Sequence, residues 1–373
     1  MFFVNPNNYT SEQIDNALRF MNKSRQVSFR YDLLDRNDIK QGELDGIESA
    51  KISYGEFNII KRSATFRLNE YLQRNINYLT EQIQPWFILH MPQGGTVEWP
   101  LGIFFLESPE RQIEGSYILR DIGAYDKTLI IEADRFINRH FISAGTNYVG
   151  AITKMLTMSG ITKINIQPTS SVFLADREMA IGTKVKEAVN ALLGEINYTS
   201  IAVDEIGFFY SGPYIEPAQR DITMRYIADR DSIVMPQLKD SLDIAGQPNV
   251  FVRVARNLDM ATEYVATVIN NNPSSPVSVF NRGRQIVNFD EIENIASQVT
   301  LDSYTRRIAL NAMSTYSHLS FDSALMPTHG GAETLYCDFP GFDSPQLYTE
   351  TTWDMDLRFD GVMNHGARKV VSL

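Results

Sequence analysis

The segment from Val97 to Ile131 constrains the fold of this chain more than any other stretch. It begins with a nearly unbroken apolar and aromatic run over 100–107, which ends at Ser108-Pro109. After a charged turn, a run of alternating polarity follows over 117–125. Two strand-like runs joined by a polar turn predict an antiparallel hairpin, and the apolar first strand belongs in a core. We therefore expect this segment to contain the core hairpin of a β-barrel.

The residues before this hairpin carry one helix signal and several strand signals. Thr10 and Gln13 have the Thr-x-x-Gln spacing of a capping box. Apolar residues at helical spacing follow it: Ile14, Ala17, Leu18 and Met21. About six short strands are then expected, over 27–34, 47–54, 63–68, 86–91, 102–107 and 117–125. This pattern predicts an amphipathic N-terminal helix followed by a closed or nearly closed barrel.

The middle of the chain alternates helices with short strands. A helix is expected over 148–158, and a second one begins at a Thr183 cap and stops at Gly194. Strands over 200–210 and 222–228 are expected to pair around a Pro-rich turn. These signals predict a small α+β unit.

The last third of the chain predicts a second β-rich unit with a helical insertion. Strands are expected over 249–256 and 264–269. A long helix follows a break near Thr300, with an apolar face made by Tyr304, Ile308, Ala312, Met313 and Tyr316. From Tyr348 to Phe359, apolar and polar residues alternate, which is typical of a half-buried strand.

Length and composition indicate a globular protein of several domains. A chain of 373 residues is too long for one ordinary core, and two to four domains are expected. No stretch approaches about 18 uninterrupted apolar residues, and the N-terminus does not have the features of a signal peptide. We therefore expect that the chain does not insert into a membrane. We also expect that it is synthesised in a cytoplasm. The single cysteine, Cys337, excludes an internal disulfide and is expected to be a part-buried thiol.

The net charge of −11 argues against a sequence-reading nucleic-acid binder, because affinity for DNA comes largely from clustered Lys and Arg. An acidic protein can still surround DNA, since a negatively lined passage lets a polyanion slide without adhering. A solubilising surface charge is the alternative interpretation.

Two glycine-containing motifs are candidates for enzyme sites. Gly145 to Gly150 has the spacing of a phosphate loop, but Ala151-Ile152 stands where Lys and Ser or Thr are required. His329-Gly330-Gly331 is similar to an oxyanion-hole turn, yet no Gly-x-Ser-x-Gly elbow supplies a nucleophile. A plain glycine turn is the favoured interpretation of the second motif.

Acidic residues give no metal or catalytic motif either. Asp354, Asp356 and Asp360 lack the glycine and terminal glutamate of a calcium loop. Asp204 and Glu205 are adjacent, so on a strand they would point to opposite faces, although carboxylate pairs for glycan cleavage meet only in three dimensions. No His-Glu-x-x-His motif occurs. We therefore assign no catalytic, cofactor-binding or metal-binding residue and expect no cofactor.

Several short motifs, in order, resemble those of the tail-tip (baseplate) hub proteins of tailed bacteriophages, especially the prophage tail protein family of long-tailed phages of Gram-positive hosts. The opening segment contains "PLGIFFLESP" and "AYD" at 124–126. The other motifs lie at 47–54, 60–66, 189–198, 204–207, 213–220, 248–251 and 270–276. The resemblance covers roughly 24–373.

This resemblance implies an α+β, β-rich fold with two β-barrel-like domains separated by smaller α+β domains. We expect an N-terminal helix and first barrel over 1–145, an α+β domain over 146–230, and a second barrel-like domain with a helical insertion over 231–373. The resemblance also implies that the two barrels stand quasi-equivalently around an axis. A homotrimer would then present a pseudo-sixfold face to a hexameric ring.

The expected function is that of a structural virion protein, not an enzyme, which forms the trimeric hub at the distal end of the tail tube. Its implied partners are the distal tail protein ring, the tape-measure protein and a receptor-binding or lytic tip protein, while DNA passes through without specific binding. Assembly is expected in the host cytoplasm. The chain ends at Leu373 without the long extension of many relatives, so lytic activity is expected on a separate polypeptide.

Two alternatives belong to other functional classes. A tail-associated cell-wall hydrolase, degrading peptidoglycan, would need a carboxylate pair or metal triad in a cleft. A secreted carbohydrate-binding β protein would need clustered exposed aromatics, whereas Trp86, Trp99 and Trp353 lie in apolar strand contexts and are expected in the core.

Overall fold

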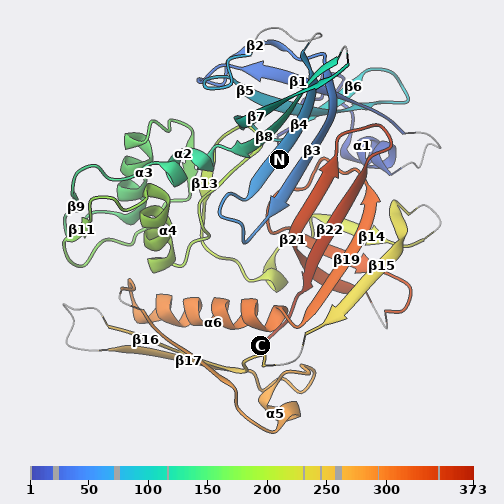
Figure 1. Ribbon diagram of the computed structural model, residues 1–373. Helices are drawn as coiled ribbons and strands as arrows, with labels where there is room; N and C mark the ends of the chain where they lie inside the picture. Colours follow the sequence, from blue (N-terminus) through green and yellow to red (C-terminus); the bar gives the residue numbers. More distant parts are fainter. Residues whose placement is uncertain are drawn as a thin grey trace.

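A large β-sheet dominates the fold (Figure 1). The computed structural model describes residues 2–19, 25–70, 76–115, 117–229, 232–243, 246–256, 263–292, 294–342 and 345–373. Within these residues, 14 strands form one sheet, with a main path β15-β19-β22-β21-β3-β4-β8-β7-β5-β1-β2. Eight of its strands come from the first third of the chain: β1 (Gln26–Leu34), β2 (Lys40–Glu43), β3 (Ile47–Gly55), β4 (Arg62–Asn69), β5 (Gln82–His90), β6 (Thr96–Pro100), β7 (Phe104–Glu114) and β8 (Tyr117–Asp126). The others are β14 (Met224–Ile227), β15 (Val234–Leu242), β19 (Ser317–Ala324), β20 (Thr334–Asp338), β21 (Gln346–Asp356) and β22 (Val362–Lys369).

The hairpin predicted from the opening segment is present as β7 and β8, which pair antiparallel from Phe104↔Asp126 onwards. The prediction that the first strand ends at Ser108-Pro109 is wrong. The strand continues to Glu114, with a register shift between Glu107 and Glu110. Proline is tolerated at such an irregularity because its missing N–H is not needed by the ladder.

The first and last blocks of the chain are joined by pairing between β3 and β21, from Thr352↔Gly55 to Asp356↔Lys51. In the described residues the main path remains open at both ends, β15 and β2. The β-rich α+β class is confirmed, whereas the closed or nearly closed barrel is not, and the two-barrel layout stays a prediction. One hydrophobic core draws on both blocks, with Phe66 and Phe87 from the first and Phe321 and Met355 from the second.

The N-terminal helix α1 (Ser11–Leu18) begins as predicted, with the reciprocal Thr10–Gln13 capping box formed. Ile14, Ala17 and Leu18 are buried, and Met21 lies outside the described residues. The capping box satisfies two backbone N–H groups at the helix start, and the apolar face attaches the helix to the core of the sheet.

A separate α+β unit with its own core follows the first block (Figure 1). It contains α2 (Thr128–Ala133), β9 (His140–Ile142), α3 (Tyr148–Met158), β10 (Ile164–Ile166), β11 (Arg177–Met179), α4 (Val185–Glu195), β12 (Ala202–Val203), β13 (Phe209–Ser211) and the 3-10 turn η2 (Pro217–Gln219). The boundaries of α3 match the prediction.

Two predictions in this unit are wrong. The N-cap of α4 is Lys184, without a side-chain cap, and Gly194 lies inside the helix. The strands predicted over 200–210 and 222–228 do not pair with each other. Instead, β12 and β13 form their own hairpin, while β14 pairs parallel with β20 of the large sheet.

A small three-stranded sheet covered by a long helix forms the remaining unit (Figure 1). It consists of β16 (Val250–Ala255), β17 (Tyr264–Ile269), the short α5 (Val279–Arg282), β18 (Val287–Ile292) and α6 (Gln298–Ser314). Phe251 of β16 packs with Ala309 and Met313 of α6. No helix of the described residues is both long enough and apolar enough to cross a membrane.

The alternation predicted near the C-terminus is observed along β21. Trp353, Met355 and Leu357 are buried, and Asp354 lies on the opposite face. Phe359 was expected to continue the apolar side, but it is 82% exposed because the strand has already ended at Asp356. Of the three tryptophans, Trp99 and Trp353 are in the core, and Trp86 is half-buried beneath the guanidinium of Arg30.

Candidate functional site

The central strands of the large sheet have one apolar and one polar face, because residue types alternate along them. Ala50 and Ile52 of β3 are buried, while Lys51 and Ser53 point to the other side. Cross-strand neighbours share a face, so the register defines rows on the polar face. One row runs from β19 to β7 through Asp322, Asn364, Asp354, Ser53, Ser63, Tyr125 and Phe105. A second row contains Asp356, Lys51, Thr65, Gly123 and Glu107.

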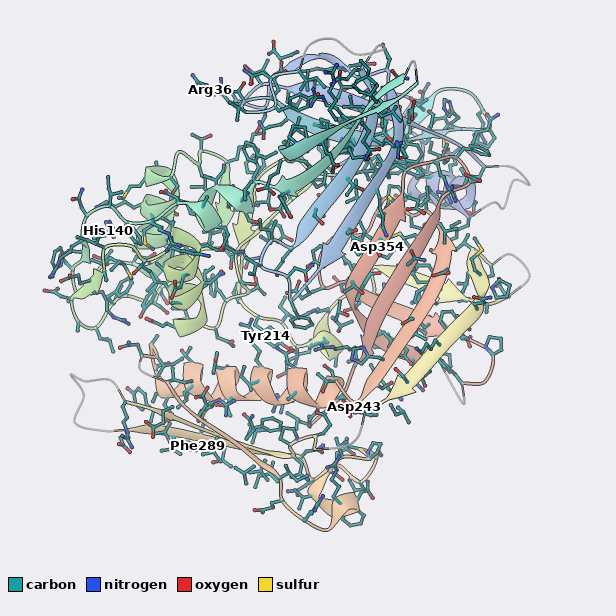
Figure 2. All side chains as sticks on the ribbon, viewed as in Figure 1. Arg36, His140, Tyr214, Asp243, Phe289 and Asp354 are labelled. Carbon is teal, nitrogen blue, oxygen red and sulfur yellow. The ribbon has the colours of Figure 1, made fainter. Side chains whose placement is uncertain are left out.

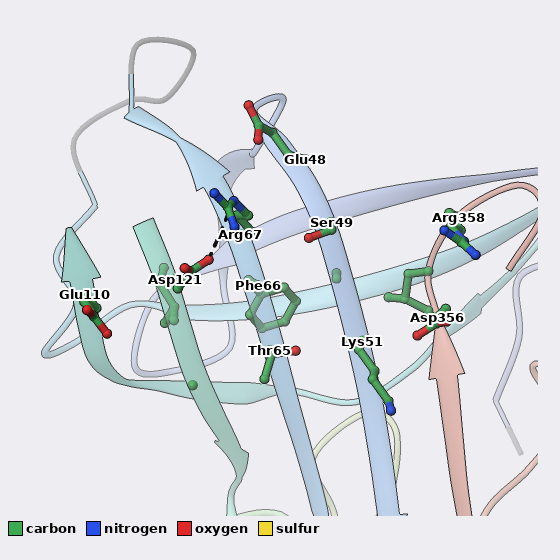
Figure 3. Close-up of a pocket in the computed structure, with 14 residues that line it drawn as sticks. Glu48, Ser49, Lys51, Thr65, Phe66, Arg67, Glu110, Asp121, Asp356 and Arg358 are labelled. Carbon is green, nitrogen blue, oxygen red and sulfur yellow. Dashed lines mark ion pairs between the residues drawn. The ribbon is translucent and has the colours of Figure 1, made fainter. Parts of the chain in front are cut away.

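Charges on this polar face are largely paired with each other. Lys51 Nζ lies 3.3 Å from Asp354 Oδ2, and Arg67 Nε lies 3.9 Å from Asp121 Oδ1. Figure 3 shows the Arg67–Asp121 pair in a hollow of about 710 Å³ over β3, β4 and β8. The charged residues lining it are Glu48, Glu110, Asp121 and Asp356 against Lys51, Arg67 and Arg358. The hollow is therefore close to neutral with a small excess of carboxylates.

The two halves of this sheet have the same strand order. Each half contributes four strands to the path, β15-β19-β22-β21 and then β3-β4-β8-β7. If the four strands of a half are numbered by their order in the chain, their order in the sheet is first, second, fourth, third in both halves. The corresponding strands also have similar lengths, with 9 residues in β15 and β3, 8 in β19 and β4, and 11 in β21 and β7. The sheet thus repeats one four-stranded pattern twice.

Both ends of this eight-stranded stretch carry unpaired edges in the described part of the chain. β15 pairs only with β19. β7 pairs with β5 only at Phe104 and Phe105, so the rest of its outer edge is free of β5. Exposed apolar residues lie at both edges: Leu242 at the end of β15 is 65% exposed and Ile113 of β7 is 68% exposed. Unpaired strand edges with apolar side chains are sites of strand pairing between chains.

The motif at Gly145–Gly150 forms an ordinary helix start. The Asn147 side chain accepts a hydrogen bond from the backbone N–H of Gly150 and caps α3. Asp354, Asp356 and Asp360 are not brought together as a metal-binding group in the described residues. Asp354 pairs with Lys51 on the polar face, and Asp360 pairs with Arg358 at 3.3 Å.

Asp204 and Glu205 lie in a turn rather than on a strand, and both line one cavity of about 540 Å³ with Glu333. The Asp204 carboxylate accepts backbone hydrogen bonds from Ile206 and Phe208, which is why the chain turns there. Arg62 Nη2 lies 3.5 Å from the Glu205 carboxylate. Burial raises the pKa of Asp204 and of Glu333.

His329 belongs to a buried network that the sequence does not indicate. The imidazoles of His329 and His365 each place Nδ1 2.6 Å from the Glu350 carboxylate. Tyr226 Oη lies 2.7 Å from His329 Nε2, and Ser323 Oγ lies 2.8 Å from His365 Nε2. His329, Glu350 and His365 form the one group of potential metal ligands among the described residues, with ligand atoms within 4.8 Å of one another.

All four imidazole nitrogens of this network have hydrogen-bond partners, so a metal ion would have to displace them. Burial would lower the pKa of His329, but the Glu350 charge and hydrogen bond raise it above its usual value. Burial lowers the pKa of His365 despite the same carboxylate. Burial alone would raise the pKa of Glu350, but His329 and His365 lower it to about 2. The group is therefore a closed network in which the carboxylate and one imidazolium neutralise each other.

In sequence, the chain matches no known family profile. It matches no curated protein either. Its fold, however, is similar to solved tail proteins. The tail protein from Neisseria meningitidis superposes with a TM-score of 0.65 at 8% identity, covering 92% of this chain and 96% of that one. The 43 kDa tail protein of prophage MuSo2 from Shewanella oneidensis gives 0.64 at 8% identity, with 91% and 98% covered.

A third similar structure is the prophage tail protein gp18 from Listeria monocytogenes, with a TM-score of 0.54 at 11% identity and 90% and 94% of the two chains covered. At such identities the likeness concerns the fold, and the restriction to Gram-positive hosts stays a prediction. The resemblance seen in the sequence is confirmed at that level: this chain has the fold of phage and prophage tail proteins.

Proposed function

We propose that this chain is a structural, non-enzymatic virion protein, three copies of which form the hub ring at the distal end of a phage tail tube. The observation that carries the proposal is the polar-faced sheet with a repeated strand pattern and two unpaired edges. The likeness to tail proteins over more than nine-tenths of each chain supports it.

The repeated pattern suggests how the copies join. Within the chain, the last strand of one half, β21, pairs with the first strand of the other, β3. The equivalent strands at the free ends are β7 and β15. In the proposed ring, β7 of each copy pairs with β15 of the next, as β21 pairs with β3 inside one chain. Such a head-to-tail contact is heterologous, and three copies close it into a ring.

The width of such a ring suits a DNA passage. Three copies of the eight strands from β15 to β7 would line it. Twenty-four strands about 4.8 Å apart give a circumference of roughly 115 Å and a diameter of roughly 37 Å before strand tilt widens it. A B-form duplex fits such a lumen. Over β3, β4 and β8 the polar face would line it with four carboxylates and three cations, so this stretch offers no excess of Lys and Arg for DNA to bind.

In this arrangement, the block over 1–145 and the block over 231–373 are the two barrel-like domains, and the α+β domain over 146–230 stands between them. The repeat makes the trimer pseudo-sixfold, which fits docking on the distal tail protein ring. The tape-measure protein would end in the lumen, and a receptor-binding or lytic tip protein would lie below. The proposed location is the virion tail tip, after assembly in the host cytoplasm.

Substitutions at the two free edges test the ring. Leu242→Lys on β15 and Ile113→Lys on β7 place a charge where the next copy would pack, so both should reduce ring formation. Leu79→Lys is the matched control, because Leu79 is 93% exposed in a turn outside the sheet. Light scattering for mass and electron microscopy of assembled tails are the measurements. Strictly monomeric wild-type protein that never enters a ring, or normal rings from both edge variants, would refute the proposal.

The cell-wall hydrolase remains the alternative, and the cavity with Asp204, Glu205 and Glu333 is the observation that favours it. Raised carboxyl pKa values beside a second carboxylate are typical of glycan hydrolysis. Clearing of peptidoglycan suspensions by the wild type, lost in Glu205→Gln and Glu333→Gln, would establish that activity. No clearing by the wild type supports the structural role.

A further inference from the structure

A cavity of about 220 Å³ lies where four parts of the fold meet. It is lined by the turn after β3, the segment 214–220, the last turns of α6, and the paired strands β21 and β22. Figure 2 labels Tyr214 at this junction, between the α+β unit and α6. Its lining shares no residue with the hollow over β3, β4 and β8 or with the hydrogen-bonded group His329, Glu350 and His365, and Arg368 reaches it from the same face of β22 as Asn364.

The cavity has an excess of positive charge. Four cationic side chains line it: Arg220, Arg307, Arg368 and Lys369. The carboxylate among the lining residues, Glu56, is already bonded to the Tyr54 hydroxyl and to Lys61 Nζ at 2.8 Å. These four cations form no ion pair with any carboxylate in the part of the chain that the structure describes.

Neutral groups hold the arginines in place. The ring of Tyr214 lies against two of them, 4.8 Å from Arg307 and 5.5 Å from Arg220. Arg307 Nη1 donates to the backbone oxygen of Tyr198 at 2.7 Å, and Arg220 Nη1 donates to that of Ala332 at 3.0 Å. Since carbonyls and aromatic rings carry no net charge, they orient the guanidinium groups without neutralising them.

Arg368 and Tyr214 each contribute a buried polar atom without a partner. The Arg368 guanidinium lies 4.4 Å from the ring centre of Phe57, and its Nε has no hydrogen-bond partner. The Tyr214 hydroxyl is also buried and unpartnered. Burial lowers the pKa of both Arg307 and Arg368, and for Arg307 the nearby Tyr214 and Glu56 offset this effect only in part. Unmet donors of this kind are costly unless a ligand accepts from them.

We propose that this cavity binds a small oxyanion of the phosphate type. Such an anion accepts hydrogen bonds from several guanidinium N–H groups and from a hydroxyl at once. The planar guanidinium group of arginine matches the spacing of phosphate oxygens, so arginine is well suited to bind this kind of ligand. The cavity is smaller than the roughly 300–1,000 Å³ of sites for drug-sized ligands, so it favours inorganic phosphate or a small phosphate monoester over a nucleotide. The bound anion would join α6, β22 and the segment 214–220.

Thermal unfolding of the full chain with inorganic phosphate, against chloride at equal ionic strength, tests this site. A ligand at about 100 times its Kd should raise the Tm by on the order of 4 °C for a chain of this size. The double variant Arg307→Gln/Arg368→Gln should show no such rise. Arg358→Gln is the matched control, because Arg358 is exposed and away from the cavity.

Calorimetric titration adds a readout that does not depend on unfolding. Tyr214→Phe removes only the unpartnered hydroxyl and should weaken phosphate binding roughly tenfold. It keeps the test valid if the double variant fails to fold. A parallel titration with glycerol phosphate identifies the source, since tighter binding than inorganic phosphate would indicate a phosphorylated metabolite. Absence of saturable binding to the wild type, or equal binding to Tyr214→Phe and to any folded double variant, would overturn the proposal.

Discussion

Replacing Glu350 by glutamine should make the protein sensitive to mild acid. In the wild type the carboxylate accepts hydrogen bonds from both His329 and His365 in a fully buried site. Glutamine keeps the shape but removes the charge. It can still bond both imidazoles if its amide donates to His365 Nδ1, because that ring can then donate from Nε2 to Ser323 Oγ while Ser323 donates to the Ala324 carbonyl at 2.8 Å. At pH 8 the variant should therefore lose little stability.

The difference grows as the pH falls. In the wild type the pKa of His329 is raised above that of the unfolded chain by Glu350, so its contribution is fully present below about pH 6.5 and is lost only as pH rises through the folded pKa. Without Glu350, burial outweighs the remaining attraction of Glu333, so we expect the pKa of His329 to lie below that of the unfolded chain and stability to be lost as the pH falls below about 6.5. An imidazole that stays neutral in the folded variant lowers the free energy of unfolding by about 2 kcal/mol between pH 8 and pH 5. Nearly all of this loss occurs over the roughly 1.5 pH units below 6.5, each worth about 1.36 kcal/mol.

Urea titrations of both proteins at pH 8, 7, 6 and 5, followed by tryptophan fluorescence, measure the difference in free energy of unfolding between the wild type and Glu350→Gln. Glu107→Gln is the matched control, since Glu107 is an exposed glutamate on a strand of the same sheet. The control should follow the wild type at every pH. Free energies of unfolding for Glu350→Gln that run parallel to the wild type from pH 8 to pH 5 would refute this account of the network.

Three further predictions follow from the same structure. The double variant Asp354→Lys/Asp356→Lys makes the polar face basic and should slow DNA release from tails. The slowing should be larger at low salt than at high salt, because salt screens charges and a Debye length of about 8 Å at physiological salt confines the effect to the lumen wall. A normal rate of DNA release at both salt concentrations would contradict this prediction. Trp353→Ala should lower the free energy of unfolding by about 3–5 kcal/mol in urea titrations, since Trp353 stacks on Tyr54 at 5.7 Å and donates to the Gly330 carbonyl at 2.9 Å; a loss below about 1 kcal/mol would exclude this packing. Burial raises the pKa of the Cys337 thiol, so a thiol reagent should label it only on unfolding, and rapid labelling of the native protein would show the strand pairing around it to be wrong.

Local patterns in the sequence predicted the elements whose contacts are close in the chain. The Thr10–Gln13 box starts α1, the 148–158 helix has the expected bounds, and β7 and β8 form the expected hairpin. In each, side-chain spacing and turn residues act within a few positions. The boundaries of α4 differ from the prediction because residue preferences at Thr183 and Gly194 are weak, and tertiary packing of α4 overrides a weak cap and a single glycine.

The candidate sites required contacts between distant residues. The pairing of β3 with β21 brings opposite ends of the chain together, and the repeat of strand order is visible only once that pairing is known. The Glu350 network and the arginine-lined cavity likewise collect residues from separate strands, turns and α6. The sequence by itself determined α1, α3, the β7–β8 hairpin, the alternation along β21 and the net charge. The tertiary structure alone decided which edges stay open and which buried charges meet, because pairing partners and burial depend on the whole chain rather than on neighbouring residues.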